Sequence, residues 1–457
     1  MVEIELNESV SALDEIEHVV VLMLENRSFD HMLGYLSLEG GRQDVDGLQR
    51  GMQNSYRGET HRVYRARQTV LMKAQDPCHS GSCVDEQLAN QNGGFAANYL
   101  RTRSASAPRR PVVVMGYHNA EHLPIYDYLG RTYCVCDRWF CSVRGATFPN
   151  RLYAVTGRAD GSRDNKSPPT YDIPSFFREL DKAGVSWRWY TPETFPSLWA
   201  IDRSYLVQSL DNVRPFSSPF TKLDFFSAAQ NGNLPSVAWI DPNFVDTGGA
   251  VSSNDDHPPS DLRAGQELVL HVFNALARSP AWARTLLVVT YDEHGGFFDH
   301  VEPPAAADDS PDPAFHAYGP RVPALAVSAR LGTRVSHELF DHTSIIKTCL
   351  VRFCRRDHLI PDLGARVTKA QHLGVLLGGR ARAAPAARTL AGLSQTLADW
   401  RSQELDARLS AQAEAIHPDA ESLTDFQEDY LAGRRSVLES LTPGERGQLA
   451  KSLIATT

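Results

Sequence analysis

Two apolar segments, each stopped by oxygen-bearing side chains, constrain the fold of this chain more than any other feature. Residues 19–24 (VVVLML) form an unbroken apolar run that is rich in β-branched residues. Residues 285–291 (TLLVVTY) form a second run of the same kind, far downstream. Such runs are typical of strands buried on both faces, as in a parallel sheet. We therefore predict an α/β fold in which both runs are strands of one central sheet.

The residues that end these runs are candidate metal ligands: Glu25 and Asn26 after the first, Asp292 and Glu293 after the second. In open α/β sheets, ligands bind beyond the carboxyl ends of the strands. Carboxylate and carbonyl oxygens suit Mg, Ca or Mn, and the neighbouring His294 also admits Zn. For the first run alone, a solvated strand end followed by a helix cap explains the residues equally well.

Charge and hydropathy narrow the classes of partner. The 457 residues include 46 Lys and Arg against 55 Asp and Glu, a net charge of −9 that does not favour nucleic acid or an anionic membrane as the main partner. No apolar run approaches the roughly 20 residues of a transmembrane helix. The acidic start (MVEIEL) lacks the basic region of a signal peptide. We expect a cytoplasmic protein, one exported without a cleaved leader, or an extracellular protein whose leader has been removed.

The seven cysteines do not form a disulfide framework, because their number is odd. Cys78 and Cys83 flank a short Gly-Ser turn and can pair in an oxidising compartment. Most of the others lie in apolar context, and we expect them to be buried thiols.

The chain divides into a main domain and an extension. Residues 1–377 carry the recurring strands and acids, interrupted by a long irregular insertion at about 39–115. A loop of this length is either a lid or substrate wall, or a simple surface insertion, and the sequence does not separate the two. Residues 378–457 are predicted to be a linker and a helical C-terminal extension that docks on the main domain.

Thr147 is predicted to lie near a helix N-terminus, because Pro149 follows it by two residues and proline is favoured in the first helical turn. Free backbone N–H groups and the positive end of the helix dipole would face Thr147 there, which suits a phosphate group. From this segment alone, a simple helix cap is the favoured interpretation.

Five motifs in order resemble those of the bacterial phosphoesterase family that holds the phosphatidylcholine-preferring phospholipases C and the acid phosphatase A enzymes; plant non-specific phospholipases C are similar. The resemblance covers residues 16 to 355 and rests on ENRSFDH at 25–31, TFPNR at 147–151, DHPP at 256–259, YDEHGGFFDH at 291–300 and DHTS at 341–344. It implies an alkaline-phosphatase-like, three-layer α/β/α sandwich with a mostly parallel central sheet.

The resemblance also implies roles for the candidate site residues. Glu25, Asn26, Asp292 and Glu293 would hold a divalent metal (Ca, Mg, Mn or Zn), and Thr147 would be the nucleophile. Asn150 would hold phosphoryl oxygens. Three histidines would act as leaving-group acids or stabilise the oxyanion: His118, His257 and His294. His300 and His342 match motif positions and are either supporting or structural residues.

These residues lead us to expect a metal-dependent phosphoric ester hydrolase. The leading hypothesis is a phospholipase C that releases diacylglycerol and a phosphorylated head group through a phosphothreonine. The alternatives are an acid phosphatase acting on soluble phosphomonoesters and an inactive binding or effector module. A phospholipid or small phosphate ester is the expected partner, and peripheral membrane contact is compatible with this expectation. Four aromatic residues are candidates for a choline cage but are more simply explained as core residues: Trp187, Trp189, Tyr190 and Trp239.

Overall fold

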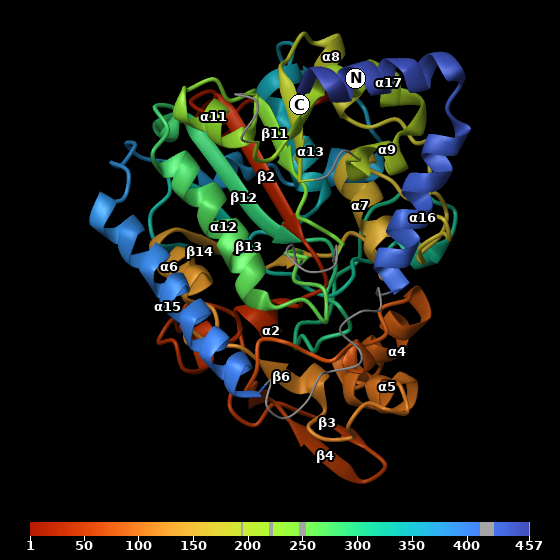
Figure 1. Ribbon diagram of the computed structural model, residues 1–457, viewed down its shortest axis with the longest axis vertical. Helices are drawn as coiled ribbons and strands as arrows, with labels where there is room; N and C mark the ends of the chain where they lie inside the picture. Colours follow the sequence, from red (N-terminus) through yellow and green to blue (C-terminus); the bar gives the residue numbers. More distant parts are fainter. Residues whose placement is uncertain (193–194, 219–222, 246–252, 412–424, 457) are drawn as a thin grey trace.

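An eight-stranded sheet forms the centre of the protein (Figure 1). The computed structural model describes residues 1–192, 195–218, 223–245, 253–411 and 425–456. All strands of the sheet run in one direction except β13, which pairs antiparallel with both its neighbours. In spatial order, the strands are β10 (Val213–Pro215), β9 (Trp187–Thr191), β11 (Val237–Ile240), β2 (His18–Leu24), β12 (Thr285–Tyr291), β13 (Ala324–Ser328), β7 (Cys134–Cys136) and β14 (Arg334–Ser336).

The two predicted apolar strands, β2 and β12, are neighbours in the middle of this sheet. They pair in parallel, with Leu24 opposite Tyr291, and every residue of both strands is buried. This continuous burial explains why neither strand alternates apolar and polar residues. Because the strands end in register, Glu25 and Asp292 emerge side by side at the carboxyl edge of the sheet.

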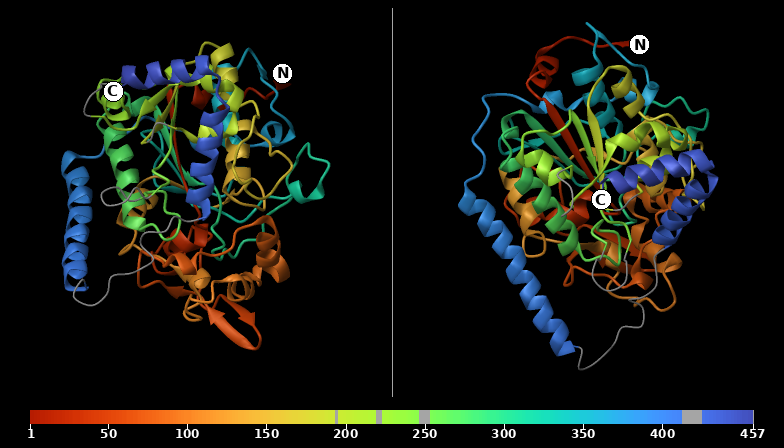
Figure 2. Two further views of the ribbon diagram at one scale, coloured as in Figure 1. Left: turned by 45° about the vertical axis from the view of Figure 1, so that its right-hand side comes forward. Right: turned by 45° about the horizontal axis from the view of Figure 1, so that its top comes forward.

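Helices cover both faces of the sheet and make the predicted three-layer α/β/α arrangement (Figures 1 and 2). One layer contains α6 (Pro124–Thr132), α11 (Phe225–Gln230) and α12 (Leu262–Ala277). The other contains α7 (Thr147–Thr156), α8 (Phe177–Lys182), α9 (Ser197–Ile201) and α13 (Thr343–Cys349). Short helices α2 (Phe29–Met32) and α3 (Tyr35–Leu38) follow β2.

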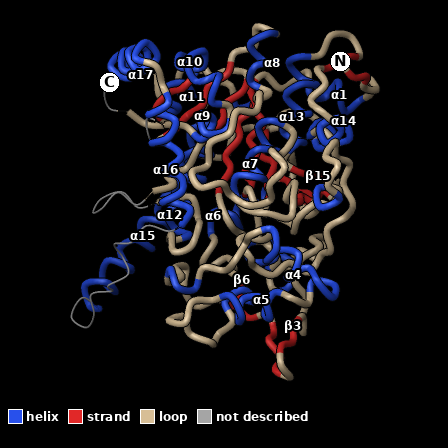
Figure 3. The backbone as a smooth tube through the Cα atoms, turned by 90° about the vertical axis from the view of Figure 1, so that its right-hand side faces the viewer, coloured by secondary structure: helices blue, strands red, loops and turns tan. Residues whose placement is uncertain are grey.

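Residues 39–115 are more regular than predicted. This insertion forms the hairpin of β3 (Gln53–Tyr56) and β4 (Glu59–Arg62), and the helices α4 (Gly81–Asn92) and α5 (Phe95–Thr102). Its β5 (Tyr64–Arg65) pairs with β6 (Gly116–Tyr117). The Gly-, Gln- and Asn-rich composition hid these elements, because α4 depends on the Ser80 cap and on tertiary contacts rather than on helix propensity. Figure 3 shows the hairpin projecting from one end of the molecule.

The C-terminal helices pack on the main body. Helix α15 (Ala387–Ala411) contacts α12 and α6, whereas α16 (Asp425–Ser440) contacts α9 and α17 (Pro443–Thr456) contacts α10 (Leu206–Ser209). The Tyr430 hydroxyl of α16 donates to the Phe195 carbonyl at 2.8 Å. Thr442 and Glu445 form the N-terminal cap of α17 by reciprocal hydrogen bonds. Residues 412–424 of the predicted extension lie outside the described residues.

The packing of the core shows where the four aromatic residues and the cysteines lie. The four aromatic residues considered for a choline cage are at most 1% exposed, and Trp189 stacks on Trp239 at 5.1 Å, so they belong to the core. Cys78 and Cys83 form a disulfide, and the other five cysteines are buried free thiols. Among the described residues, no helix is both long and apolar enough to cross a membrane.

Candidate active site

The joint ends of β2 and β12 hold the acidic residues together. The Asp292 backbone N–H donates to the Leu24 carbonyl at 3.1 Å, and the Asn26 N–H donates to Asp292 Oδ1 at 3.3 Å. The Glu293 N–H also donates to Asp292 Oδ1, at 2.6 Å. Parallel register therefore continues one residue beyond the strands and fixes these acids with respect to each other.

Arg151, on the first turns of α7, supplies positive charge between the two strand ends. Its Nη2 lies 3.1 Å from Glu25 Oε1, and its Nε lies 3.0 Å from Asp292 Oδ2. All three side chains are buried, and the guanidinium stacks on Phe244 with 4.9 Å to the ring centroid. One buried guanidinium thus faces two carboxylates, with Glu293 as a third nearby.

The acids retain unused oxygen atoms. Neither oxygen of Glu25 accepts a hydrogen bond of favourable geometry from a described residue, although Oε1 lies 3.1 Å from Arg151 Nη2. The same holds for Glu293 Oε1, which lies 3.0 Å from His79 Nδ1. Burial, followed by the charge of Asp292, raises the pKa of Glu25 well above its ordinary value. Burial also raises the pKa of Asp292 to about 7, against the lowering effect of Arg151. Buried carboxylate oxygens without donors are costly unless a cation neutralises them. The donor set therefore fits a divalent metal.

A second acidic cluster lies beside α2. Asp30, Asp299 and His300 each offer one ligand atom within 4.8 Å of the others. Here, however, Arg321 donates to Asp299 Oδ1 at 2.8 Å and to Asp30 Oδ1 at 3.2 Å, and His300 Nδ1 lies 2.7 Å from Asp30 Oδ2. This cluster already carries its own cations. We call the residues at the ends of β2 and β12 the strand-end group: Glu25, Asn26, Asp292 and Glu293. Its carboxylate oxygens without hydrogen bonds make it the better match for a metal ion.

Thr147 lies against the strand-end group. It is fully buried at the start of α7, and its Oγ1 donates to Asn26 Oδ1 at 3.4 Å. Ala146 occupies the N-cap position, so the hydroxyl of Thr147 is not the helix cap. The simpler interpretation of this residue, a capping threonine, is therefore wrong.

Asn150 supports the loop that presents Thr147. Its amide nitrogen donates to the carbonyls of Gly145 and Ala146 at 3.0 and 3.1 Å, and its Oδ1 accepts from the Val143 N–H at 3.0 Å. In this arrangement the amide fixes the 143–146 backbone. Its role as a ligand of phosphoryl oxygens stays a prediction.

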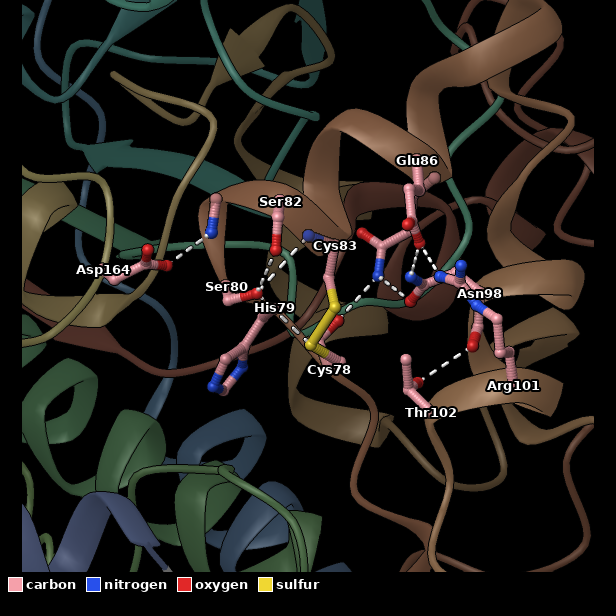
Figure 4. Close-up of a disulfide and its surroundings, with 12 residues drawn as sticks. Cys78, His79, Ser80, Ser82, Cys83, Glu86, Asn98, Arg101, Thr102 and Asp164 are labelled. Atoms are coloured by element: carbon pink, nitrogen blue, oxygen red, sulfur yellow. Dashed lines mark hydrogen bonds and ion pairs between the residues drawn. A yellow bond between two sulfur atoms is a disulfide. The ribbon is translucent and has the colours of Figure 1, made fainter.

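His79 joins the group and was not predicted. Its Nδ1 lies 3.0 Å from Glu293 Oε1 and 2.7 Å from the Asn26 amide nitrogen. Burial lowers the pKa of His79, but the carboxylate of Glu293 raises it further, to about 9. The residue sits inside the loop closed by the Cys78–Cys83 disulfide, and its ring projects away from that loop (Figure 4). A histidine between two cysteines in an irregular segment gave no motif signal.

Gln87 connects this loop to His294. Its Oε1 accepts from His294 Nε2 at 2.7 Å, and its Nε2 donates to the Cys78 carbonyl at 2.6 Å. His294 Nε2 therefore carries the proton, and Nδ1, 3.3 Å from Glu293 Oε2, has no hydrogen-bond partner among the described residues. The insertion thus determines which nitrogen of His294 faces the acids.

The remaining predicted histidines occupy different surroundings. The His257 ring lies 5.7 Å from that of His79, and burial lowers its pKa to about 3. His118 packs edge-on against His31 at 4.7 Å and contacts His122, and burial holds its pKa well below the ordinary value. His342 Nε2 donates to the Asp292 carbonyl at 2.5 Å. His257 therefore borders the strand-end group, His118 belongs to a separate histidine cluster, and His342 supports Asp292 from behind.

Gly295 allows the loop after β12 to approach Asn26. Its φ of +63° is left-handed, and a Cβ at this position would lie 2.1 Å from the Asn26 carbonyl oxygen. Glycine is the residue that satisfies both conditions. The same backbone donates the Gly295 N–H to Glu293 Oε2 at 2.7 Å, which orients that carboxylate.

Comparison with known proteins gives the family of the chain. Residues 16–354 match the phosphoesterase family. The chain belongs to this family. It is a hydrolase of phosphoester bonds. The match contains every residue of the strand-end group, together with the insertion and its disulfide.

Individual relatives of this phosphoesterase are similar over most of their length. Phospholipase C B of Mycobacterium tuberculosis is 32% identical over 75% of this chain and 74% of its own length. Non-specific phospholipase C6 of Arabidopsis thaliana is 32% identical over 73% of this chain and 67% of its own. Among solved structures, a protein in the alkaline phosphatase superfamily from Vibrio parahaemolyticus matches with a TM-score of 0.34 and 11% identity, over 56% of this chain and 65% of that one.

Proposed function

We propose that this phosphoesterase is a metal-dependent phospholipase C that cleaves the bond between glycerol and phosphate in phosphatidylcholine-type phospholipids. The observation that carries the proposal is the buried Thr147 hydroxyl, 3.4 Å from Asn26 and beside three acids that one guanidinium does not neutralise. The similarity to phospholipases C from a bacterium and a plant supports the choice of a phospholipid substrate.

The proposed metal ligands are Glu25, Asn26, Asp292 and Glu293. A divalent ion bound there would lower the pKa of a nearby hydroxyl and stabilise negative charge on the phosphoryl oxygens. Its identity among Ca, Mg, Mn and Zn stays open, because the ligand atoms are oxygens with one imidazole, His294, alongside. Arg151 would hold Glu25 and Asp292 in place from the side of α7.

Thr147 would act as the nucleophile. The Thr147 hydroxyl releases its proton to solvent as Oγ1 forms a bond to phosphorus, and the bond from phosphorus to the glycerol oxygen breaks, which leaves the head-group phosphate on the threonine. The departing glycerol oxygen takes a proton and leaves as diacylglycerol. Water then attacks the same phosphorus, restores the Thr147 hydroxyl and releases the phosphorylated head group.

Histidines are the proposed proton carriers of both steps. His79 lies against Asn26 and Glu293, where it can protonate the departing oxygen and later accept a proton from the attacking water. His294 and His257 border the same group and, with a proton on the ring nitrogen that faces it, would orient the phosphoryl oxygens. The proposed role of His118 rests on the family resemblance, because its ring contacts other histidines instead.

A paired assay tests the proposal. Purified protein is incubated with each of the four metals and with a soluble phosphocholine ester, phosphatidylcholine or an aryl phosphate monoester, and the Thr147→Ala variant serves as the blank. We expect release of phosphocholine from both diesters, little free phosphate from the monoester, and less than about 5% of the wild-type rate in the variant, since loss of a nucleophile costs several orders of magnitude. Phosphate release from the monoester with inert diesters would instead establish the acid phosphatase alternative.

A further inference from the structure

The insertion has a charge opposite to that of the rest of the molecule. Residues 39–115 hold eleven lysines and arginines against seven aspartates and glutamates, a net charge of +4. The rest of the chain therefore has a net charge of −13, which gives −9 overall. The protein is negative as a whole but contains a region of net positive charge. Attraction to an anionic surface depends on this local distribution of charge.

An open cavity of about 740 Å³ lies within this basic region. We call it the insertion groove; it is lined by Arg62, Arg67, Arg110, Leu71, Pro111 and Val113, together with neighbouring residues. Val113 is buried in the wall, while Pro111 and the adjoining Met72 are exposed. The groove therefore combines guanidinium groups with an apolar lining.

Two of its arginines have no acidic partner among the described residues. Arg110 pairs with Glu59 at 2.8 Å. Arg62 and Arg67 are exposed, and neither makes an ion pair or side-chain hydrogen bond with a described residue. Their charges are thus available to an anion outside the protein.

The groove lies next to the candidate active site. Gln75 lines it, and the following residue, Asp76, places Oδ2 4.0 Å from His257 Nε2. The segment is held there by the Leu262 N–H, which donates to the Thr69 carbonyl at 3.3 Å. Figure 1 shows that the insertion occupies the end of the molecule toward which β2 and β12 point.

We propose that the insertion groove is the surface by which this protein docks on a bilayer containing anionic phospholipid. Arg62 and Arg67 contact lipid phosphates, and Leu71, Met72 and Pro111 enter the boundary between head groups and acyl chains. A protein docked in this way would have its strand-end group on the side that faces the membrane. The inference adds a binding surface to the proposed phospholipase function.

Vesicle binding tests the docking surface separately from catalysis. Full-length Thr147→Ala protein is sedimented with vesicles of phosphatidylcholine, with and without phosphatidylglycerol, at low and high salt. The test variant adds Arg62→Ala and Arg67→Ala. The matched control adds Arg278→Ala and Arg388→Ala instead. Both arginines are exposed; Arg278 follows the C-terminal end of α12, and Arg388 lies at the start of α15.

We expect binding to the anionic vesicles that weakens with salt and falls about tenfold or more in the test variant, since each arginine near an anionic surface contributes about fivefold. The control should bind like the parent. Equal binding by both variants, absence of vesicle binding, indifference to phosphatidylglycerol, or preferential binding of RNA would overturn the proposal.

Hydrolysis of the soluble phosphocholine ester separates this outcome from the proposed function. In the active background, Arg62→Ala with Arg67→Ala should leave this rate unchanged, because neither side chain contacts the strand-end group. If the wild type does not cleave the ester while vesicle binding still depends on the two arginines, the function proposal fails and the docking surface stands.

Discussion

Arg151 makes the crowding of carboxylates at the strand ends tolerable. Three buried acids within one group would repel each other strongly in a medium of low dielectric constant. The guanidinium contacts two of them, Glu25 and Asp292, and leaves their pKa values raised rather than lowered. Without a cation, Glu25 and Asp292 therefore tend to hold protons, and a bound divalent ion would take the place of those protons.

His300 offers a test of the second acidic cluster by pH. Burial lowers its pKa, but Asp30 and Asp46 raise it further, to about 10. Below pH 6.5 the folded and unfolded chains both hold the proton and the stabilisation is complete; between pH 6.5 and 10 only the folded state holds it, so the stabilisation declines. We expect His300→Gln to lower the free energy of unfolding by about 2–4 kcal/mol at pH 6 and progressively less toward pH 10.

Chemical denaturation across this pH range measures the effect. His358→Gln is the matched control, because that imidazole is 52% exposed and lies 3.8 Å from Glu3. A His300→Gln deficit that grows as the pH rises would show that the cluster is not held by a protonated histidine.

The acids of the site were predictable from sequence, and their partners were not. Apolar runs that end in Glu25 and Asp292 predict adjacent strand ends, because parallel strands finish at one edge of a sheet. His79 has no such local signal, since its neighbours Asn26 and Glu293 lie far away in the chain. Asn150 shows the reverse case: it matches a family motif, yet its amide bonds are directed to the 143–146 backbone.

At the scale of elements, α4 and its disulfide determine where His79 and His294 lie. The disulfide closes the loop that contains His79, and Gln87 of α4 joins the Cys78 carbonyl to the ring of His294 (Figure 4). The insertion is therefore part of the active-site wall. Of the two interpretations open from sequence, these contacts support the functional one.

Loss of the disulfide should reduce turnover. We expect Cys78→Ser with Cys83→Ser to lower kcat about tenfold, because His79 loses the short closed loop that fixes it, and to lower stability by about 2 kcal/mol. A reductant should lower wild-type activity and leave this variant unchanged, since the remaining five cysteines are buried thiols. Wild-type kinetics in the double variant would contradict the positioning role of the loop.

The insertion is where sequence prediction of the elements failed. Strands β2 and β12 and helix α12 follow from burial and periodicity, which the sequence records directly. Helix α4 carries few apolar residues and a backbone break at residues 89–91. Its stability comes from contacts with distant segments, which composition does not record.

At the scale of the whole molecule, metal binding should couple the strand-end acids to folding. We expect removal of divalent metal by a chelator to abolish phosphoester hydrolysis and to lower Tm by several degrees, because a cation that binds only the folded state stabilises it by mass action. Glu25→Gln should show a smaller shift of Tm on chelation. A wild-type Tm and rate that are both independent of metal would exclude the strand-end group as a metal site.

The layers of the molecule could be predicted, whereas the position of its basic groove could not. The family resemblance implies an α/β/α sandwich, and the alternation of apolar strands with helical segments along the chain is consistent with it. The basic excess of residues 39–115 can be counted from the sequence, but the sequence does not show that these residues lie beside the active site. The fold places Arg62 and Arg67 along one groove there.

The most direct test of the account is the identity of the group carried by Thr147 during turnover. The enzyme is mixed with the soluble phosphocholine ester, quenched in acid within the first turnover and analysed by peptide mass spectrometry. We expect a phosphocholine group on the peptide that contains Thr147, and none in Thr147→Ala. An adduct on another residue, or product formation without any adduct on Thr147, would contradict the account.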